Sequence, residues 1–176
     1  EAVTTIKSDY ELRRAIMALG TRPNLTTEQA KVVLTLAQSI DSDYEKAELL
    51  VDMIKTTGVN PELMPLYIKA ADGIHSDYEK GRVLGTWTFD SGTDPEIISE
   101  ILSTIARMHS GYEKAQLLKR LAEVSSYNAR TRHDFLKAVA GIQTEYEAAQ
   151  TLAIMIGNNY RDPEFLRDVL NQDVLL

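Results

Sequence analysis

Residues 42–54 read SDYEKAELLVDMI, and residues 76–88 open with the same five letters in SDYEKGRVLGTWT. Related openings recur at the same spacing of 34 residues, without insertion or deletion, at residues 8–11 (SDYE), 110–113 (SGYE) and 144–147 (TEYE). A fixed period of this length is typical of repeat proteins, in which each copy is one supersecondary unit. We therefore divide the chain into five repeats, 8–41, 42–75, 76–109, 110–143 and 144–176.

The composition is that of a soluble globular protein. The chain has 176 residues, of which 44% are hydrophobic and 26% charged, and it is long enough to bury a substantial core. No apolar run approaches the roughly 18 residues of a membrane-spanning helix, so we expect no direct membrane insertion. The absence of cysteine excludes disulfides, thiolate nucleophiles and cysteine metal sites, and the net charge of −7 disfavours bulk attraction to nucleic acid.

The repeated opening predicts the start of a helix. A Ser or Thr followed three residues later by Glu is a capping box, in which the hydroxyl accepts from the N3 amide and the Glu accepts from the cap amide. The acid after the cap suits the positive end of the helix dipole and recurs as Asp9, Asp43, Asp77 and Glu145. The apolar pattern that follows predicts first helices at about 9–20, 43–55, 77–89, 111–123 and 145–156.

Each repeat contains a second helix start. Capping residues recur at Thr26, Asn60, Asp94, Asn128 and Asp162, and three of them precede a proline (Pro61, Pro95 and Pro163). These signals predict second helices at about 27–40, 61–74, 95–108, 129–142 and 163–174. Gly58 and Gly92 are suitable C-caps for the helices before them, and no strand pattern competes.

A lone pair of such helices cannot bury its apolar face, so stacked repeats must share one core. We predict an all-α fold, a right-handed α-solenoid of five two-helix repeats that forms a single domain over residues 1–176. Residues 1–7 align with the end of a second helix, so we expect a remnant of a preceding repeat and a segment of a longer protein. The alternative is a mature chain with its own short N-terminal cap.

The period equals that of tetratricopeptide repeats, but the Trp, Leu-Gly and Tyr signature of their first helix is missing. With a five-residue turn between its two helices, the unit is more similar to a short HEAT-like repeat, although it lacks the Asp/Arg ladder that is typical of HEAT units. The phrase SDYEK with the following Leu49-Leu50 resembles bacterial "SDYEK" repeat tracts, which accompany BlaR/MecR-type membrane metallopeptidases and other envelope proteins. The resemblance implies part of a longer bacterial protein, with a periplasmic or extracytoplasmic location favoured over others. No His-Glu-x-x-His motif is present, so it implies no peptidase activity.

The sequence offers little chemistry. His75 and His109 occupy the same position in consecutive repeats, with Asp41 one repeat earlier. Equivalent positions on stacked helices lie about 8–10 Å apart, whereas zinc ligands lie about 2.0–2.2 Å from the metal. His133 and Asp134 are sequence neighbours on a helix and do not face each other. We expect no catalytic residue, no metal site and no cofactor, and therefore no enzyme.

A tyrosine occurs at the same position of every repeat, as Tyr10, Tyr44, Tyr78, Tyr112 and Tyr146. The structural interpretation is a ladder of half-buried rings that cover the joints between repeats. The functional interpretation is a row of aromatic contacts for a ligand. Because the tyrosine is present in every copy, we favour the structural interpretation and look for function where the copies differ.

The copies differ most on one column of the second helices and in the charge of the fourth repeat. The column runs from Val32 and Leu66 to the acids Glu100, Asp134 and Asp168, while Phe89 stands at an exposed position of a first helix. The fourth repeat carries +3 on a chain that is otherwise acidic, which indicates an anionic partner, complementary stacking between repeats, or merely a solvated surface.

Assuming that the second helices line the concave side, we predict a partner-binding set of Val32, Leu66, Phe89, Arg130, His133 and Lys137. An acidic, amphipathic protein or peptide segment would suit it, in a non-catalytic interaction scaffold or a sensor or docking domain; the oligomeric state stays open. The alternative is a nucleic-acid-binding HEAT-like solenoid, which needs a basic groove. The acidic chain with one basic repeat argues against nucleic acid.

Overall fold

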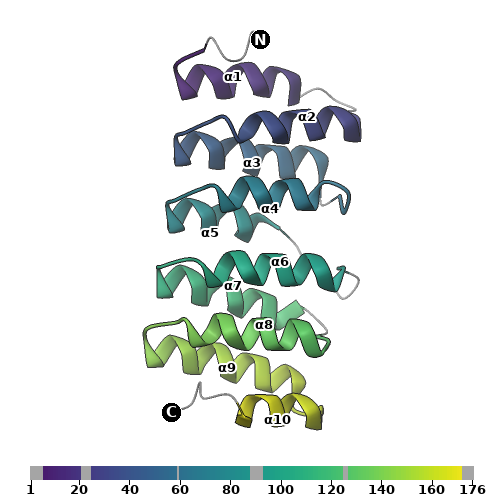
Figure 1. The fold of residues 1–176 in the computed structure, drawn as a ribbon, viewed down its shortest axis with the longest axis vertical. Coiled ribbons are helices and arrows are strands. Elements are labelled where there is room, and N and C mark those ends of the chain that lie inside the picture. Colours follow the sequence, from purple (N-terminus) through teal and green to yellow (C-terminus); the bar gives the residue numbers. More distant parts are fainter. Residues whose placement is uncertain (1–5, 21–24, 59, 88–92, 125–126, 172–176) are drawn as a thin grey trace. The chain divides into compact units, whose positions relative to one another are not determined.

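A computed structural model describes residues 6–20, 25–58, 60–87, 93–124 and 127–171. These residues form ten α-helices and contain no strand, which confirms the all-α prediction (Figure 1). The chain divides into two compact units, an N-terminal unit (Glu1–Thr88) and a C-terminal unit (Phe89–Leu176), and each is described by itself.

The N-terminal unit has two layers of helices. Its helices are α1 (Asp9–Gly20), α2 (Thr27–Ala37), α3 (Asp43–Thr57), α4 (Met64–Asp72) and α5 (Asp77–Thr86). The odd-numbered helices pack side by side in the order α1, α3, α5, and α2 packs against α4 in the other layer. The loops from α2 to α3 and from α4 to α5 lie along one edge of this unit (Figure 1).

The C-terminal unit repeats this arrangement. Its helices are α6 (Pro95–Ala106), α7 (Gly111–Val124), α8 (Ala129–Ala140), α9 (Glu145–Asn159) and α10 (Pro163–Asn171). In one layer α8 packs against both α6 and α10, and in the other layer α7 packs against α9. Within each unit, therefore, every helix lies beside its counterpart from the neighbouring repeat.

The core follows the apolar columns of the repeat. Leu50, Leu84 and Leu118 are equivalent residues of three first helices, and each is at most 1% exposed. Burying one such side chain stabilises the fold by about 2 kcal/mol. Trp87 is buried as well, and its ring meets that of Tyr67 edge-on, with centroids 6.3 Å apart.

The hydroxyl half of the capping box forms as predicted in four of the five repeats. Ser8, Ser42, Ser76 and Ser110 each accept from the amide of the Glu three residues on, at 3.3–3.4 Å. Thr144 is the exception: it makes no side-chain cap bond, and its hydroxyl donates to Glu147 at 2.6 Å.

The other half of the predicted box is wrong for the two interior caps of the N-terminal unit. The amide of Ser42 donates to Asp9 Oδ2 at 2.6 Å, and the amide of Ser76 donates to Asp43 Oδ2 at 2.7 Å. The acceptor is thus the acid of the preceding repeat, while the Glu45 carboxylate is held by the Arg13 guanidinium. The acid after the cap does more than complement the helix dipole, because it also joins one repeat to the next.

A lysine one residue after the box reaches the far end of the second helix. Lys46 Nζ donates to the carbonyl of Gly73 at 3.1 Å. The equivalent Lys114 Nζ donates to Gly141 O at 3.0 Å and to Ala106 O at 3.3 Å. A buried cation at the C-terminal end of a helix satisfies carbonyls that have no helical partner and interacts favourably with the dipole.

Two predicted boundaries change beside prolines or extended backbone, the start of α4 and the end of α5. Helix α4 begins at Met64 instead of residue 61, because Pro65 lacks the N–H that would bond to the Pro61 carbonyl; the first turn closes through bonds such as Leu63 N–H to Asn60 O, at 2.9 Å. Helix α5 ends at Thr86, after which Trp87 is extended; residues 88 and 89, which were predicted to continue it, lie outside the described residues.

Helices α2, α4, α6 and α8 end two or three residues before the predicted positions, and the predicted end of α10 lies outside the described residues. Their closing apolar residues are instead held by tight turns, with the amide of each bonded to the carbonyl three residues earlier, in Ile40, Ile74, Met108 and Ile142. Gly58 ends α3 with a φ of 67°, a conformation that favours glycine, as its C-cap prediction requires. Gly92 lies outside the described residues.

Candidate functional site

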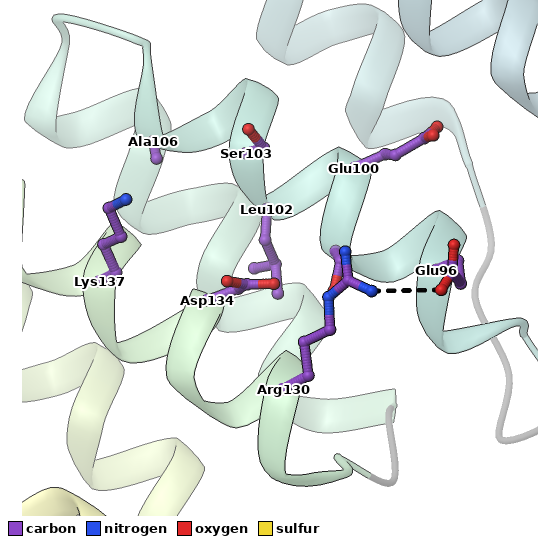
Figure 2. Close-up of a pocket in the computed structure, with 9 residues that line it drawn as sticks. Glu96, Glu100, Leu102, Ser103, Ala106, Arg130, Asp134 and Lys137 are labelled. Carbon is purple, nitrogen blue, oxygen red and sulfur yellow. Dashed lines mark hydrogen bonds and ion pairs between the residues drawn. The ribbon is translucent and has the colours of Figure 1, made fainter.

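The C-terminal unit carries an open surface pocket of about 330 Å³ between α6 and α8 (Figure 2). Its walls are built from pairs of residues that stand 34 positions apart in sequence. The pairs are Glu96 with Arg130, Glu100 with Asp134, and Ser103 with Lys137. The pocket therefore follows the seam between equivalent helices of two consecutive repeats.

The helical period explains why these side chains reach the surface. On α8, Arg130, Asp134 and Lys137 lie on one face at spacings of four and three residues. Phe135 and Leu136 lie on the opposite side and are fully buried. Apolar packing of one face of each helix thus presents the other face, with its charges, to the pocket.

The electrostatics of the pocket are polarised along the helices. At the end where α6 and α8 begin, Arg130 Nη1 lies 3.2 Å from Glu96 Oε1, and both side chains remain mostly exposed. At the other end Lys137 is exposed and, within the described part of the chain, makes no ion pair. Arg130 and Lys137 stand two helical turns apart, which is about 10 Å along the axis.

The lining of the pocket also contains a buried hydroxyl without a partner. Ser99 on α6 is 6% exposed, and its Oγ makes no hydrogen bond with the described residues. A buried hydroxyl without a partner costs about 1–3 kcal/mol. Leu102, which is buried, supplies the apolar part of the floor.

The structure brings together two of the six residues that we predicted for partner binding. Arg130 and Lys137 line the pocket, whereas His133 is exposed on the same helix but is outside the lining. Val32, which is 55% exposed on α2, and Leu66, which is partly buried on α4, belong to the N-terminal unit. Phe89 lies outside the described residues.

Sequence reasoning missed the role of Glu96, Glu100 and Ser103 as walls of the pocket. A signal was present, since each stands one period before a residue of the same face of α8. Equivalent positions of stacked helices lie side by side, so the residues that face Arg130, Asp134 and Lys137 could have been read from the repeat. Only the packing of α6 against α8, however, shows that a pocket opens there.

Several basic side chains of the fourth repeat are buried or form ion pairs within the C-terminal unit. Arg132 is only 5% exposed, in a column that is apolar in earlier repeats. Its guanidinium lies 2.6 Å from Asp162, 3.6 Å from Glu164 and 3.4 Å from Asp168. Lys114 is also buried. These contacts favour complementary stacking between repeats, which was one of the three interpretations of the basic repeat.

The equivalent residues Asp41, His75 and His109 do not form a metal site in the described part of the chain. No group of three or more His, Asp or Glu side chains there is arranged to hold a metal ion. His75 instead lies beside Asp43, with Nδ1 3.5 Å from Oδ1. Desolvation would raise the pKa of Asp43, but the amides of His75 and Ser76 outweigh it and hold that pKa below 3.8.

Comparison with protein-family models, with curated proteins and with solved structures finds no match to the chain. Among the described residues, no helix is both long enough and apolar enough to cross a membrane.

Proposed function

We propose that the chain is a non-catalytic protein-interaction scaffold, and that its five repeats continue as one right-handed α-solenoid of HEAT-like units. The observation that carries the proposal is the pocket between α6 and α8, which is open, lined by both charge signs and built along the seam between repeats. Extended surfaces of this kind are what helical repeat proteins use to bind partners.

The 34-residue register within each unit supports the solenoid. Asp9 and Asp43 each bond to the cap of the following repeat, at sequence separations of 33. Glu48 pairs with Arg82, and Glu96 pairs with Arg130, at separations of 34. Contacts that recur at the period of the sequence are those expected when every repeat stacks on its neighbour in the same way.

The partner that fits the pocket best is an amphipathic segment with an acidic residue. Its acid would meet Lys137, and its apolar side chain would cover Leu102 in the floor. A polar group that reached Ser99 would remove the cost of the unpartnered hydroxyl. The charges would set the orientation and the association rate of the segment, and the apolar contact its dissociation rate.

In the light of the SDYEK resemblance, we propose that the scaffold is a sensor or docking domain of a larger bacterial envelope protein. Nucleic-acid binding remains the weaker alternative. Phosphate contacts need exposed cations, whereas Lys114 and Arg132 are buried and Arg130 pairs with Glu96. A gel-shift titration at low salt tests it: tight, salt-sensitive binding of DNA would overturn the scaffold proposal.

The direct test is selection of peptides from a displayed random library on the full chain, followed by binding kinetics of the selected peptides. We expect acidic, amphipathic sequences whose affinity falls at least tenfold in the Arg130→Glu, Lys137→Glu double variant, with slower association and weaker salt dependence. Lys55→Glu is the matched control, because Lys55 is exposed on α3 of the other unit and outside the pocket.

The kinetics also test the rest of the predicted set. If the partner reaches the N-terminal unit, Leu66→Asp should weaken binding mainly through faster dissociation. Binding that survives all these changes but is abolished by substitution of Phe89 would place the interface on the first helices and overturn the pocket assignment.

A further inference from the structure

A second surface is formed by the tyrosines that follow the helix caps. Of the N-terminal unit, Tyr10 is 50% exposed, Tyr44 is 52% exposed and Tyr78 is 61% exposed. About half of each of these side chains is therefore open to solvent, and in the C-terminal unit Tyr112 and Tyr146 are exposed to a similar or greater degree. A large aromatic side chain that remains exposed in every repeat is a candidate contact for a partner.

In the N-terminal unit the three tyrosines occupy equivalent positions at the starts of three helices that pack side by side. The carboxylate of Asp9 in α1 accepts a hydrogen bond from the cap amide of α3, and that of Asp43 in α3 accepts one from the cap amide of α5. These bonds align the first turns of the three helices. Each tyrosine is the second residue of its helix. Adjacent packed helices are separated by about 8–10 Å, so this is the expected spacing of the row.

Arginine side chains lie against two of these rings. The guanidinium carbon of Arg82, in the third repeat, lies 5.9 Å from the centre of the Tyr44 ring. Those of Arg13 and Arg14 lie 5.8 and 5.7 Å from the centre of the Tyr10 ring. These contacts hold the rings in place while half of each tyrosine stays exposed.

The neighbourhood of the row is acidic. Residues 8–14, 41–48 and 75–82 contain eight acidic and five basic residues, a net charge of −3 with His75 neutral. Two of the five bases, Lys46 and Lys80, are buried. A partner of positive charge is therefore favoured at this surface.

We propose that the row of Tyr10, Tyr44 and Tyr78 binds a basic, proline-rich segment in the polyproline II conformation. This helix advances about 3.1 Å per residue with three residues per turn, so one side of it repeats about every 9 Å. That repeat matches the spacing of packed helices. One proline of each turn would stack on one tyrosine, as in other aromatic surfaces that recognise such segments. The net negative charge around the row would attract the basic residues between the prolines.

The probe is a fluorescently labelled peptide of four Pro-Pro-Lys triplets, titrated against the full chain by anisotropy. The control peptide has four Gly-Ser-Lys triplets, with the same length and charge but no polyproline preference. We expect saturable binding of the proline peptide at least tenfold tighter than that of the control. Equal affinity for the two peptides, or no saturation up to about 1 mM, would overturn the proposal.

Two variants test the role of the ring itself. Tyr44→Ala should weaken binding at least tenfold, whereas Tyr44→Phe, which keeps the ring, should bind like the unmodified chain. Tyr160→Ala is the matched control, because Tyr160 is 56% exposed but lies outside the column. Since Tyr44 is exposed, its loss should leave the far-UV circular dichroism unchanged. An equal loss with Tyr160→Ala, or none with Tyr44→Ala, would show that the row is not the site.

Discussion

Replacement of Asp43 by Asn will weaken the joint between the second and third repeats. One carboxylate oxygen accepts from the amide of His75 at 3.0 Å, and the other accepts from the amide of Ser76 at 2.7 Å. An Asn side chain keeps one acceptor but turns an NH₂ group toward the second amide. Of the two hydrogen bonds that the amides of His75 and Ser76 donate to the charged carboxylate, one is lost, and the other is then donated to an uncharged amide oxygen.

The expected cost is about 2 kcal/mol, since a hydrogen bond to a charged group contributes about 1.5–3 kcal/mol and a neutral one about 1 kcal/mol. The Asp43 side chain is 24% exposed, so water compensates part of the loss and larger values are not expected.

The loss should depend on pH. The pKa of Asp43 in the folded protein is below 3.8, so its carboxylate stabilises the fold above about pH 4, and this contribution disappears as the pH falls through the folded pKa. A protonated carboxyl group resembles Asn in shape and hydrogen bonding. The difference in stability between the variant and the unmodified chain should therefore shrink as the pH falls below about 4 and through the folded pKa of Asp43.

Urea unfolding followed by far-UV circular dichroism measures the free energy of unfolding of Asp43→Asn and of the unmodified chain, once at pH 7 and once in acid below about pH 4. Asp41→Asn is the control, because Asp41 is a nearby exposed acid that lacks the two amide contacts. The reasoning is refuted if the two variants are equally stable at pH 7, or if the loss in Asp43→Asn is as large in acid as at neutral pH.

Three further predictions concern stability. Ser42→Ala should cost about 1 kcal/mol and Thr144→Ala less, because only Ser42 caps its helix with its side chain; equal losses in urea unfolding would contradict this. Arg132→Met should destabilise by about 1–2 kcal/mol at neutral pH by leaving three carboxylates without their cation, with recovery in acid; a loss independent of pH in the same assay would point to packing instead. Burial raises the pKa of Tyr67 to about 12, so an ultraviolet titration should leave at least one tyrosine un-ionised at about pH 11, and the stability that the neutral Tyr67 contributes should be lost as the pH rises from 10 to 12; ionisation of all tyrosines together near pH 10 would be inconsistent with the burial.

The positions of the helices were largely predictable because their start signals are local. Asp94 and Asn128 cap their helices through residues two or three positions away, as the sequence predicted. Helix α4 was misplaced because two opposing local signals meet there, a good cap at Asn60 and a second proline at Pro65. In that case the missing amide of Pro65 decided where the regular helix begins.

For the contacts between repeats, the sequence predicted the spacing along the chain but not which side chain bonds to which group. The sequence shows that Asp9 follows one helix cap and that Ser42 is the cap of the next repeat, but nothing in either segment says that the Asp9 carboxylate replaces the Glu of the capping box. That choice depends on where the neighbouring helix lies, which is a property of the packed layer. The same holds for Lys46, whose partner Gly73 is 27 residues away.

The sequence by itself determined the repeat, the helices and the faces that are buried, because these follow from capping chemistry and the helical period. The tertiary structure alone decided which charges remain for a partner. Arg132 and Lys137 are both basic and stand five residues apart on α8. Arg132 is buried beside Asp162, which precedes α10, and Asp168, which lies on α10, whereas Lys137 is exposed at the pocket. A long side chain can bury its charge only where a neighbouring helix supplies the opposite charge, and that neighbour is set by packing.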